Sequence, residues 1–259
     1  MTCRRVLVMR LVPRSMQLIP RRQLSAISSV SEEAPPDFRR FDWEKISKER
    51  GEGFPEWLRQ DLRSNHAGEM GAVHIYKGAK TAMTLRSFLS NSMERALGAG
   101  VTGMLPACVY KDLDASPAMA FVEEHMETES RHLVLMEKLV PAEERSRLLP
   151  VWRLAGFITG FAPVFLSQTP RPFFVTINAV EDFVERHFMD QITPLEQEGW
   201  APELTKLLSS CCEDEVHHKD MAADFAGIQS KEDVGPVLGL WTSAVEHGSG
   251  LAVTLARRF

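Results

Sequence analysis

Apolar residues recur every three or four positions along most of the chain after residue 56, which is the spacing of one buried helix face. This pattern predicts an all-α protein whose helices are separated by turns containing proline or glycine. Ser116 and Pro117, for example, form a typical N-cap followed by proline at the first helical position. Helices are expected from Trp57 onward, over 117–140, over 151–166, over 173–198, from Pro202 onward and over 237–257.

Two stretches lack a clear helical pattern. Residues 84–116 combine a glycine-dotted apolar run with Pro106, and they are interpreted as a loop with at most one short helix. Residues 32–56 begin with Pro35-Pro36 and contain clusters of charged residues, so they are interpreted as a linker into the domain.

Two of the expected helices carry a Glu and a His three positions apart, which places both side chains on one face. Each pair follows a helix with one acid on its apolar face. Because burying a bare carboxylate is very costly, such acids must bind a metal, pair with a base or be protonated. Four carboxylates and two imidazoles on four helices are the ligand set of a di-iron or di-manganese carboxylate bundle. The candidate ligands are Glu69, Glu129, His132, Glu181, Glu215 and His218.

A second register competes in the last of these pairs, because Asp214 and His217 have the same spacing as Glu215 and His218. The apolar pattern favours Glu215 and His218. The positions on their face are Leu204, Leu208, Cys211, Ala222 and Phe225, whereas the face of Asp214 and His217 carries Glu203, Leu207, Ser210, Met221 and Asp224.

The donor set constrains the chemistry of the metal. Mixed oxygen and nitrogen ligands suit iron or manganese better than a metal that prefers thiolates. Six side chains cannot saturate two such ions, so coordination positions are left for dioxygen. A purely structural bundle, with its acids paired to arginines, is the alternative, but it does not explain two independent Glu-x-x-His pairs on core faces.

Charge divides the chain into two unequal parts. The formal net charge is −5, yet residues 1–31 contain six arginines and no acid, so the rest carries 24 basic against 35 acidic residues. An Arg-rich, Ser-containing, acid-free start is typical of an organellar transit peptide, and a disordered basic tail is the alternative. We therefore expect a mitochondrial transit peptide at 1–31, a linker at 32–56 and one domain at 57–259. The acidic mature chain argues against a nucleic-acid partner.

Cysteines and apolar runs exclude further classes. The four cysteines form no framework of spaced pairs, which argues against a disulfide scaffold and against a zinc site. No run of 18 uninterrupted apolar residues occurs, so no conventional membrane-spanning helix is predicted. Residues 151–166 are nearly all apolar, and we expect this helix to rest on the bundle with one side and to meet a membrane with the other. Together with the last helix it would border a substrate entrance, with Phe157, Phe161 and Trp241 in the membrane contact and Arg257 and Arg258 at head groups.

Three motifs resemble those of the demethoxyubiquinone hydroxylases of coenzyme Q biosynthesis: His66-Ala67-Gly68-Glu69-Met70-Gly71-Ala72, Ala179-Val180-Glu181-Asp182 and Asp214-Glu215-Val216-His217-His218. The resemblance covers residue 57 to the C-terminus. It implies a ferritin-like four-helix bundle with a di-iron centre and two additional apolar or amphipathic helices. Carried over position by position, the six candidate ligands are the iron ligands and catalytic residues, and Glu129 bridges the irons with a symmetry-related carboxylate.

The resemblance also implies an activity. Such an enzyme is a monooxygenase that hydroxylates the ring of a polyprenylated demethoxyubiquinone or demethoxyubiquinol with O2 and NADH-derived electrons. It lies peripherally on the matrix side of the mitochondrial inner membrane. Its implied partners are a lipid-binding accessory protein of ubiquinone biosynthesis and a larger biosynthetic complex.

The chain departs from the family pattern at several points. Met70 and Phe188 stand where relatives usually have tyrosine, whereas His187 matches, and residues 80–116 are interpreted as an insertion. Three other functions use the same features: a ferritin-type ferroxidase or iron store, a quinol oxidase of the alternative-oxidase type, and a non-enzymatic helical scaffold at a membrane surface.

Overall fold

The computed structural model describes residues 40–97 and 116–259, and every regular element in those ranges is helical. The expectation of an all-α protein is thus confirmed. The transit peptide expected at 1–31 lies outside the described residues. Two single-turn 3-10 helices, Ala142–Glu144 and Lys231–Val234, accompany seven α-helices in the described part. The α-helices are α2 (Trp43–Gly51), α3 (Glu56–Leu97), α4 (Pro117–Leu139), α5 (Leu149–Leu166), α6 (Arg171–Glu198), α7 (Pro202–Ala226) and α8 (Pro236–Arg258).

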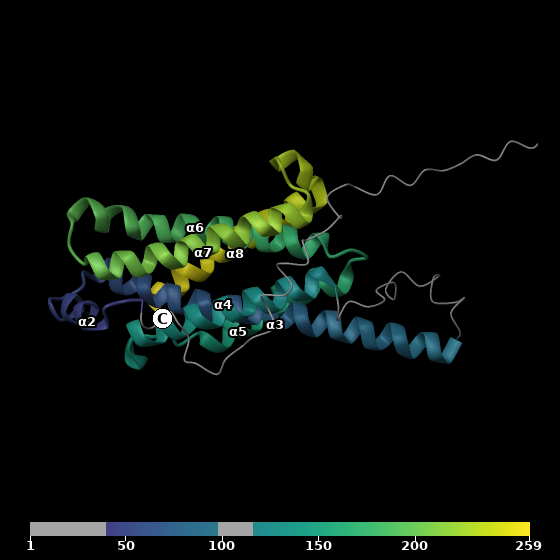
Figure 1. The fold of residues 1–259 in the computed structure, drawn as a ribbon, viewed down its shortest axis with the longest axis horizontal. Helices are drawn as coiled ribbons and strands as arrows, with labels where there is room; N and C mark the ends of the chain where they lie inside the picture. The colour runs from purple at the N-terminus through teal and green to yellow at the C-terminus, as the bar shows by residue number, and fades with distance from the viewer. Residues whose placement is uncertain (1–39, 98–115) are drawn as a thin grey trace, which may run out of the picture. The chain divides into compact units, whose positions relative to one another are not determined.

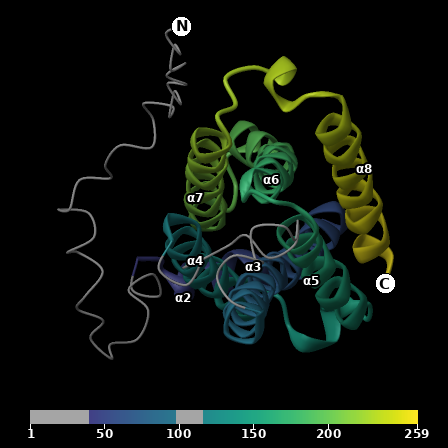
Figure 2. The ribbon, with the colours of Figure 1, turned by 90° about the vertical axis from the view of Figure 1, so that its right-hand side faces the viewer.

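Four long helices form a bundle, as expected for a ferritin-like fold (Figure 1). Helix α3 packs along α4, and α6 packs along α7. Figure 2 looks along the bundle and shows α5 and α8 on the same side of it, next to α3 and α6. The two additional helices therefore cover one side of the bundle, and α4 and α7 lie on the other.

The core consists of two apolar layers with a polar layer between them. One apolar layer includes Leu62, Leu139, Phe188 and Leu204, and the other includes Tyr76, Val122, Phe174 and Ala222. On each of the four bundle helices, the candidate ligands lie between the residues that pack in one apolar layer and the residues that pack in the other. Water is therefore excluded from the acids along the bundle axis.

Glycines bring α5 into backbone contact with α3. A Cβ atom on Gly156 would lie 2.2 Å from the carbonyl oxygen of Gly71, and one on Gly160 would lie 1.8 Å from that of Ile75. Residues with side chains at these positions would force the helices apart. The expectation that one side of α5 rests on the bundle is confirmed, while Leu154, at 61% exposure, lies on the opposite side.

The interpretation of residues 84–97 as a loop was wrong, because α3 continues to Leu97. Residues 98–115, the rest of the expected loop, lie outside the described residues. Polar residues on the buried face concealed the helix: Arg86 is 2% exposed and Ser90 is 1% exposed. The Arg86 guanidinium donates hydrogen bonds to the carbonyl oxygens of Val164 and Ser167, where α5 ends. A buried side-chain cation thus satisfies carbonyls that a helix C-terminus leaves without partners.

Part of the expected linker is also helical, namely α2. Asp42 caps it, since the Asp42 side chain accepts a hydrogen bond from the Lys45 amide. Only Ile46 is buried on α2, so an apolar period could not reveal the helix. The Glu49 carboxylate accepts hydrogen bonds from the amides of Glu203 and Leu204, so α2 in turn caps the first turn of α7.

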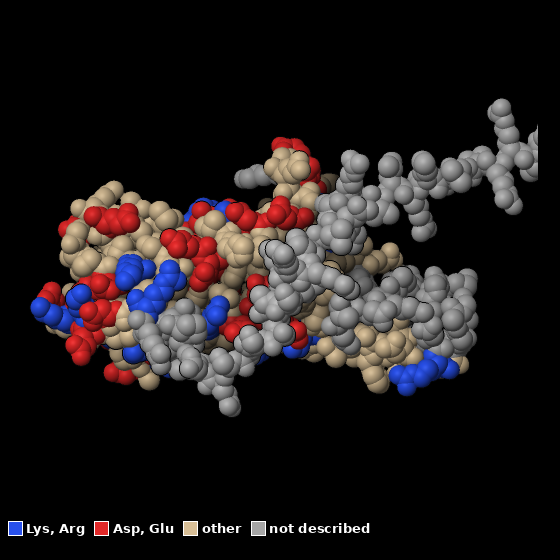
Figure 3. Space-filling model, in the orientation of Figure 1, with Lys and Arg blue, Asp and Glu red and all other residues tan. Residues whose placement is uncertain are grey.

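Charges of both signs intermingle on the face drawn in Figure 3, where acidic and basic side chains alternate over the bundle. On the described part of that face, the basic side chains form no continuous surface. It is in keeping with the acidic composition of the chain beyond residue 31.

Candidate metal centre

The structure brings all six candidate ligands together in the polar layer. Glu69 comes from α3, Glu129 and His132 from α4, Glu181 from α6, and Glu215 and His218 from α7. Each is at most 5% exposed. The two Glu-x-x-His spacings place both members of each pair on the inner face of one helix, as the apolar pattern predicted.

These side chains form two overlapping groups that could each hold a metal ion. One contains Glu69, Glu129, His132 and Glu215, and the other contains Glu129, Glu181, Glu215 and His218. Within a group, the potential ligand atoms lie within 4.8 Å of one another. Glu129 and Glu215 belong to both groups, and they occupy the same position in the two copies of the Glu-x-x-His motif.

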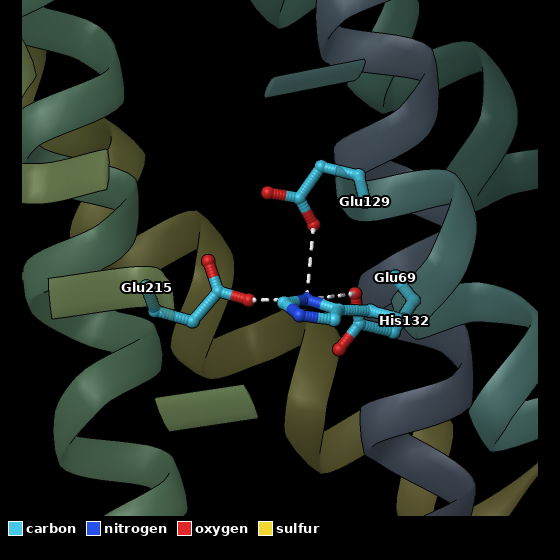
Figure 4. A group of neighbouring side chains, drawn as sticks. All are labelled: Glu69, Glu129, His132 and Glu215. Atoms are coloured by element: carbon cyan, nitrogen blue, oxygen red, sulfur yellow. Dashed lines mark hydrogen bonds and ion pairs between the residues drawn. The ribbon is translucent and has the colours of Figure 1, made fainter. Parts of the chain in front are cut away.

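His132 directs one ring nitrogen into the first group. Figure 4 shows its imidazole between Glu215 and Glu69, with Glu129 approaching from another side. Nδ1 lies 3.0 Å from Glu215 Oε1, 3.8 Å from Glu69 Oε2 and 3.9 Å from Glu129 Oε2. One imidazole nitrogen among three carboxylates from three helices is a suitable arrangement for a divalent cation.

The second group contains buried polar atoms without hydrogen-bond partners. His218 Nδ1 lies 3.0 Å from Glu129 Oε1 and 3.3 Å from Glu215 Oε2. None of these three atoms has a partner in hydrogen-bond geometry. Leaving buried polar atoms unpaired is costly. A cation at this point would satisfy all three, so the residues present fit a metal.

The pKa values show how strongly the acids crowd one another. Burial raises the pKa of Glu69 well above its usual value, and the neighbouring Glu129 and Glu215 add to the effect. Burial likewise raises the pKa of Glu181, with further contributions from Glu215 and Glu129. Burial alone would lower the pKa of His218, but the adjacent Glu129 and Glu215 outweigh it and raise the pKa to about 11. The cluster therefore requires positive charge, which divalent cations supply.

Asp214 lies outside the cluster of candidate ligands, but it contacts one of them, His132. Its side chain is 51% exposed, which confirms that Glu215 and His218 occupy the core face. Asp214 Oδ2 nevertheless lies 3.1 Å from His132 Nε2, the ring nitrogen turned away from the cluster. Such a carboxylate fixes the orientation and tautomer of a ligating histidine. The sequence could not reveal this contact, because it joins α7 to α4.

Tyr76 lies on the buried face of α3 that carries Glu69, as its spacing indicates, and it makes a second contact that the sequence did not reveal. Its side chain is fully buried, and its hydroxyl donates a hydrogen bond of 3.4 Å to Glu181 Oε1. Burial raises the pKa of Tyr76 well above its usual value, and Glu181 adds to the rise. The phenol is therefore a neutral donor to one candidate ligand. Its spacing of seven residues from Glu69 predicts the helix face on which it lies, but it does not predict the contact with Glu181.

The positions that depart from the family pattern differ in their surroundings. The Met70 sulfur accepts a hydrogen bond of 3.3 Å from Arg153 Nε on α5. Phe188 and His187 both line the cavity beside the acids. His187 Nε2 lies 2.9 Å from Ser64 Oγ, and burial lowers the pKa of His187 to about 4.

A cavity of about 350 Å³ reaches the cluster from the side covered by α5 and α8. Glu69, Glu129, Glu181 and Glu215 all contribute to its wall. Most of the remaining wall is apolar or small, including Ile75, Val180, Val184, Trp241 and Val245. Its volume lies within the range of about 300–1,000 Å³ typical of small-molecule sites. The arrangement can admit an apolar molecule to a metal pair while excluding water.

Comparisons with known proteins agree with this site. Residues 106–256 match the model of a family described as ubiquinone biosynthesis protein COQ7, a range that contains every candidate ligand except Glu69. The chain is 25% identical over 201 residues to an NADPH-dependent 3-demethoxyubiquinone 3-hydroxylase, mitochondrial, of Dictyostelium discoideum, covering 76% of this chain and 75% of the relative. It is 24% identical over 204 residues to the rat protein of the same name, covering 77% of each.

A bacterial relative extends the comparison. The 3-demethoxyubiquinol 3-hydroxylase of Rhodospirillum rubrum is 25% identical over 201 residues, covering 76% of each chain. The family match itself spans more than half of the 259 residues. The chain belongs to the COQ7 family of ubiquinone biosynthesis proteins.

Proposed function

We propose that this protein is a di-iron monooxygenase that hydroxylates the ring of a polyprenylated demethoxyubiquinone or demethoxyubiquinol with O2 in ubiquinone biosynthesis. The observation that carries the proposal is the apolar cavity whose inner wall is formed by the four buried carboxylates. A ferroxidase would need a polar path for hydrated ions, and a scaffold would need no cavity. The names of the relatives support the same reaction.

The six candidate ligands would hold the two irons, and Glu129 and Glu215 belong to both groups. A di-iron centre supplies the activation of dioxygen. The protein itself excludes water through the two apolar layers and orients His132 through Asp214. It also holds Glu181 through the hydroxyl of Tyr76. The apolar cavity wall orients the quinone ring toward the carboxylates, where the reacting carbon must lie.

The mouth of the cavity supports access from a membrane. Ala155 on α5 and Ala244 on α8 line the cavity and are also exposed. Each belongs to an exposed apolar face. On α5 that face includes Val151, Leu154, Ile158 and Leu166, and on α8 it includes Val237, Leu240 and Leu251. These faces would bring the opening to the hydrocarbon boundary, where a polyprenyl substrate resides.

Several residues expected in the membrane contact also have partners within the protein. The Trp241 indole nitrogen donates a hydrogen bond of 2.8 Å to Thr176 Oγ1, so this ring anchors α8 to α6. Phe157 and Phe161 are half-buried and stack on each other. Arg257 pairs with Asp61 at 2.5 Å. The exposed leucines and isoleucine are the better candidates for membrane contact.

Helix α5 is, within the described residues, the one helix long and apolar enough to cross a membrane, with a mean hydropathy of 1.5 over Leu149–Leu166 and 17% of that stretch buried. Length and composition alone are weak evidence, and the glycine face of α5 is packed on α3. The proposal therefore places the protein peripherally, on the matrix side of the mitochondrial inner membrane. The mitochondrial names of the relatives support the organelle.

The remaining components of the proposal are the reductant and the partners. A reduced nicotinamide dinucleotide is the proposed electron source; NADH was expected from the sequence, whereas the names of the mitochondrial relatives specify NADPH.

A lipid-binding accessory protein of ubiquinone biosynthesis, within a larger biosynthetic complex, is proposed as the partner that delivers the tailed substrate. We further propose that residues 57–259 form the enzymatic domain, with α2 packed against it through the first turn of α7, and that residues 1–31 are removed on import.

The decisive experiment is a quinone profile of a strain that lacks the protein. Accumulation of demethoxyubiquinone with loss of ubiquinone, reversed by the wild-type gene and not by a Glu215→Ala variant, is the expected result. A normal ubiquinone level in the deletion strain would refute the proposed reaction. Unchanged ubiquinone with disturbed iron storage would favour a ferroxidase.

Metal analysis of the purified mature chain provides an independent test. About two irons per chain are expected, with most of the iron lost in Glu215→Ala. The matched control is His217→Ala, two positions along the same helix, where the side chain is exposed. Equal loss of iron from the two variants would show that the assignment of the core face is wrong.

A further inference from the structure

The glycines within the described long helices differ in their surroundings. Gly78, Gly156 and Gly160 are required by packing, because a Cβ atom at any of them would lie about 2 Å from a backbone atom of the neighbouring helix. At Gly68, Gly239 and Gly248 a Cβ atom would meet nothing within 4 Å. These three lie inside helices and have no positive φ. Neither close packing nor backbone conformation therefore explains why they lack a side chain, and glycine weakens a helix.

Of Gly68, Gly239 and Gly248, two line the cavity and one does not. Gly248 on α8 and Gly68 on α3 are both lining residues and are both exposed. Gly239 belongs to α8 as well but is not part of the cavity wall. An exposed residue in the wall of a cavity that ends on buried carboxylates lies where that cavity opens. Gly248 adjoins Ala244 and Ala252 on the same face of α8, and both are also lining residues.

We infer that Gly248, together with Gly68, determines which substrates can enter, because the missing side chains leave room for the tail of the quinone at the cavity mouth. This inference rests on the proposed function. When the ring reaches the carboxylates, the tail must extend toward the exposed end of the cavity. There it passes between α3 and α8. A Cβ atom at 248 would meet nothing within 4 Å, so a side chain there can extend into that space and discriminate against tailed substrates.

The test compares the wild type with Gly248→Leu, Gly248→Ala and the matched control Gly239→Leu, all as the full iron-loaded chain. Binding is measured by quenching of tryptophan fluorescence, since Trp152 and Trp241 line the cavity. The probes are two benzoquinones that differ only in carrying no tail or a ten-carbon tail. Thermal unfolding and iron content of each variant show whether the fold and the metal centre are intact.

We divide the dissociation constant of the tailed benzoquinone by that of the tailless one. The expected result is that Gly248→Leu raises this ratio by about tenfold or more. Gly248→Ala gives a smaller change in the same direction, and Gly239→Leu leaves the ratio as in the wild type. Equal ratios in Gly248→Leu and the wild type, or an equal loss of both ligands, would overturn the inference. A wild type that binds neither benzoquinone would instead refute the proposed function.

Discussion

Replacing His66 should make the protein less sensitive to acid. His66 is fully buried on α3, and neither ring nitrogen has a hydrogen-bond partner. Burial lowers the pKa of His66 from 6.5 to about 4, with a smaller contribution from Arg145. Between these values the unfolded chain binds a proton at this residue and the folded chain does not. The free energy of unfolding therefore falls as the pH decreases through this window.

The magnitude follows from the shift. A difference of about 2.5 pKa units corresponds to roughly 3 kcal/mol at pH values below both constants, and to roughly 2 kcal/mol between pH 7 and pH 5. His66→Leu has a similar volume and does not titrate. Its free energy of unfolding should consequently fall by roughly 2 kcal/mol less than that of the wild type when the pH is lowered from 7 to 5.

Urea denaturation at the two pH values measures this double difference, from which acid effects shared by both proteins cancel. The same substitution at the exposed His217 controls for the loss of one histidine. Parallel losses of stability in the wild type and in His66→Leu would refute the reasoning, because His66 would then not be held neutral by the fold.

Three further predictions concern packing, the metal and the N-terminus. Gly160→Ala should lower the free energy of unfolding by about 1–3 kcal/mol in a denaturant titration, because its Cβ would approach the Ile75 carbonyl oxygen to 1.8 Å; a neutral effect would contradict the close contact of α5 and α3. Asp214→Asn should weaken iron binding about 10- to 100-fold in a chelator competition, since it changes the hydrogen-bond partner of His132. Iron should still bind at saturation. An unaltered iron affinity would show that Asp214 does not support the site. N-terminal sequencing of the organellar protein should find a start near residue 31, and a mature peptide that retains Arg4 would contradict the transit peptide.

Features set by local sequence were predictable. The ligand pairs follow from a spacing of three on a helix, and the end of α6 follows from Gly199, which adopts the left-handed conformation at its C-cap. Features that depend on a contact between distant segments were not. Arg86 and Ser90 conceal the last turns of α3 because their partners or neighbours lie elsewhere in the chain. In the same way, the hydrogen bond that Trp241 donates could not be predicted, since the hydroxyl that accepts it is 65 residues away.

The two halves of the bundle depend on each other through the metal centre. Helices α3 and α4 supply Glu69, Glu129 and His132, and α6 and α7 repeat the same order with Glu181, Glu215 and His218. Neither half completes a group alone, because each group of four takes its last carboxylate, Glu215 or Glu129, from the other half. Two cations at these positions would thus link the halves at the polar layer, where apolar packing contributes least. Metal binding and folding of the bundle are therefore thermodynamically linked, because ions that bind only the assembled site favour the folded state.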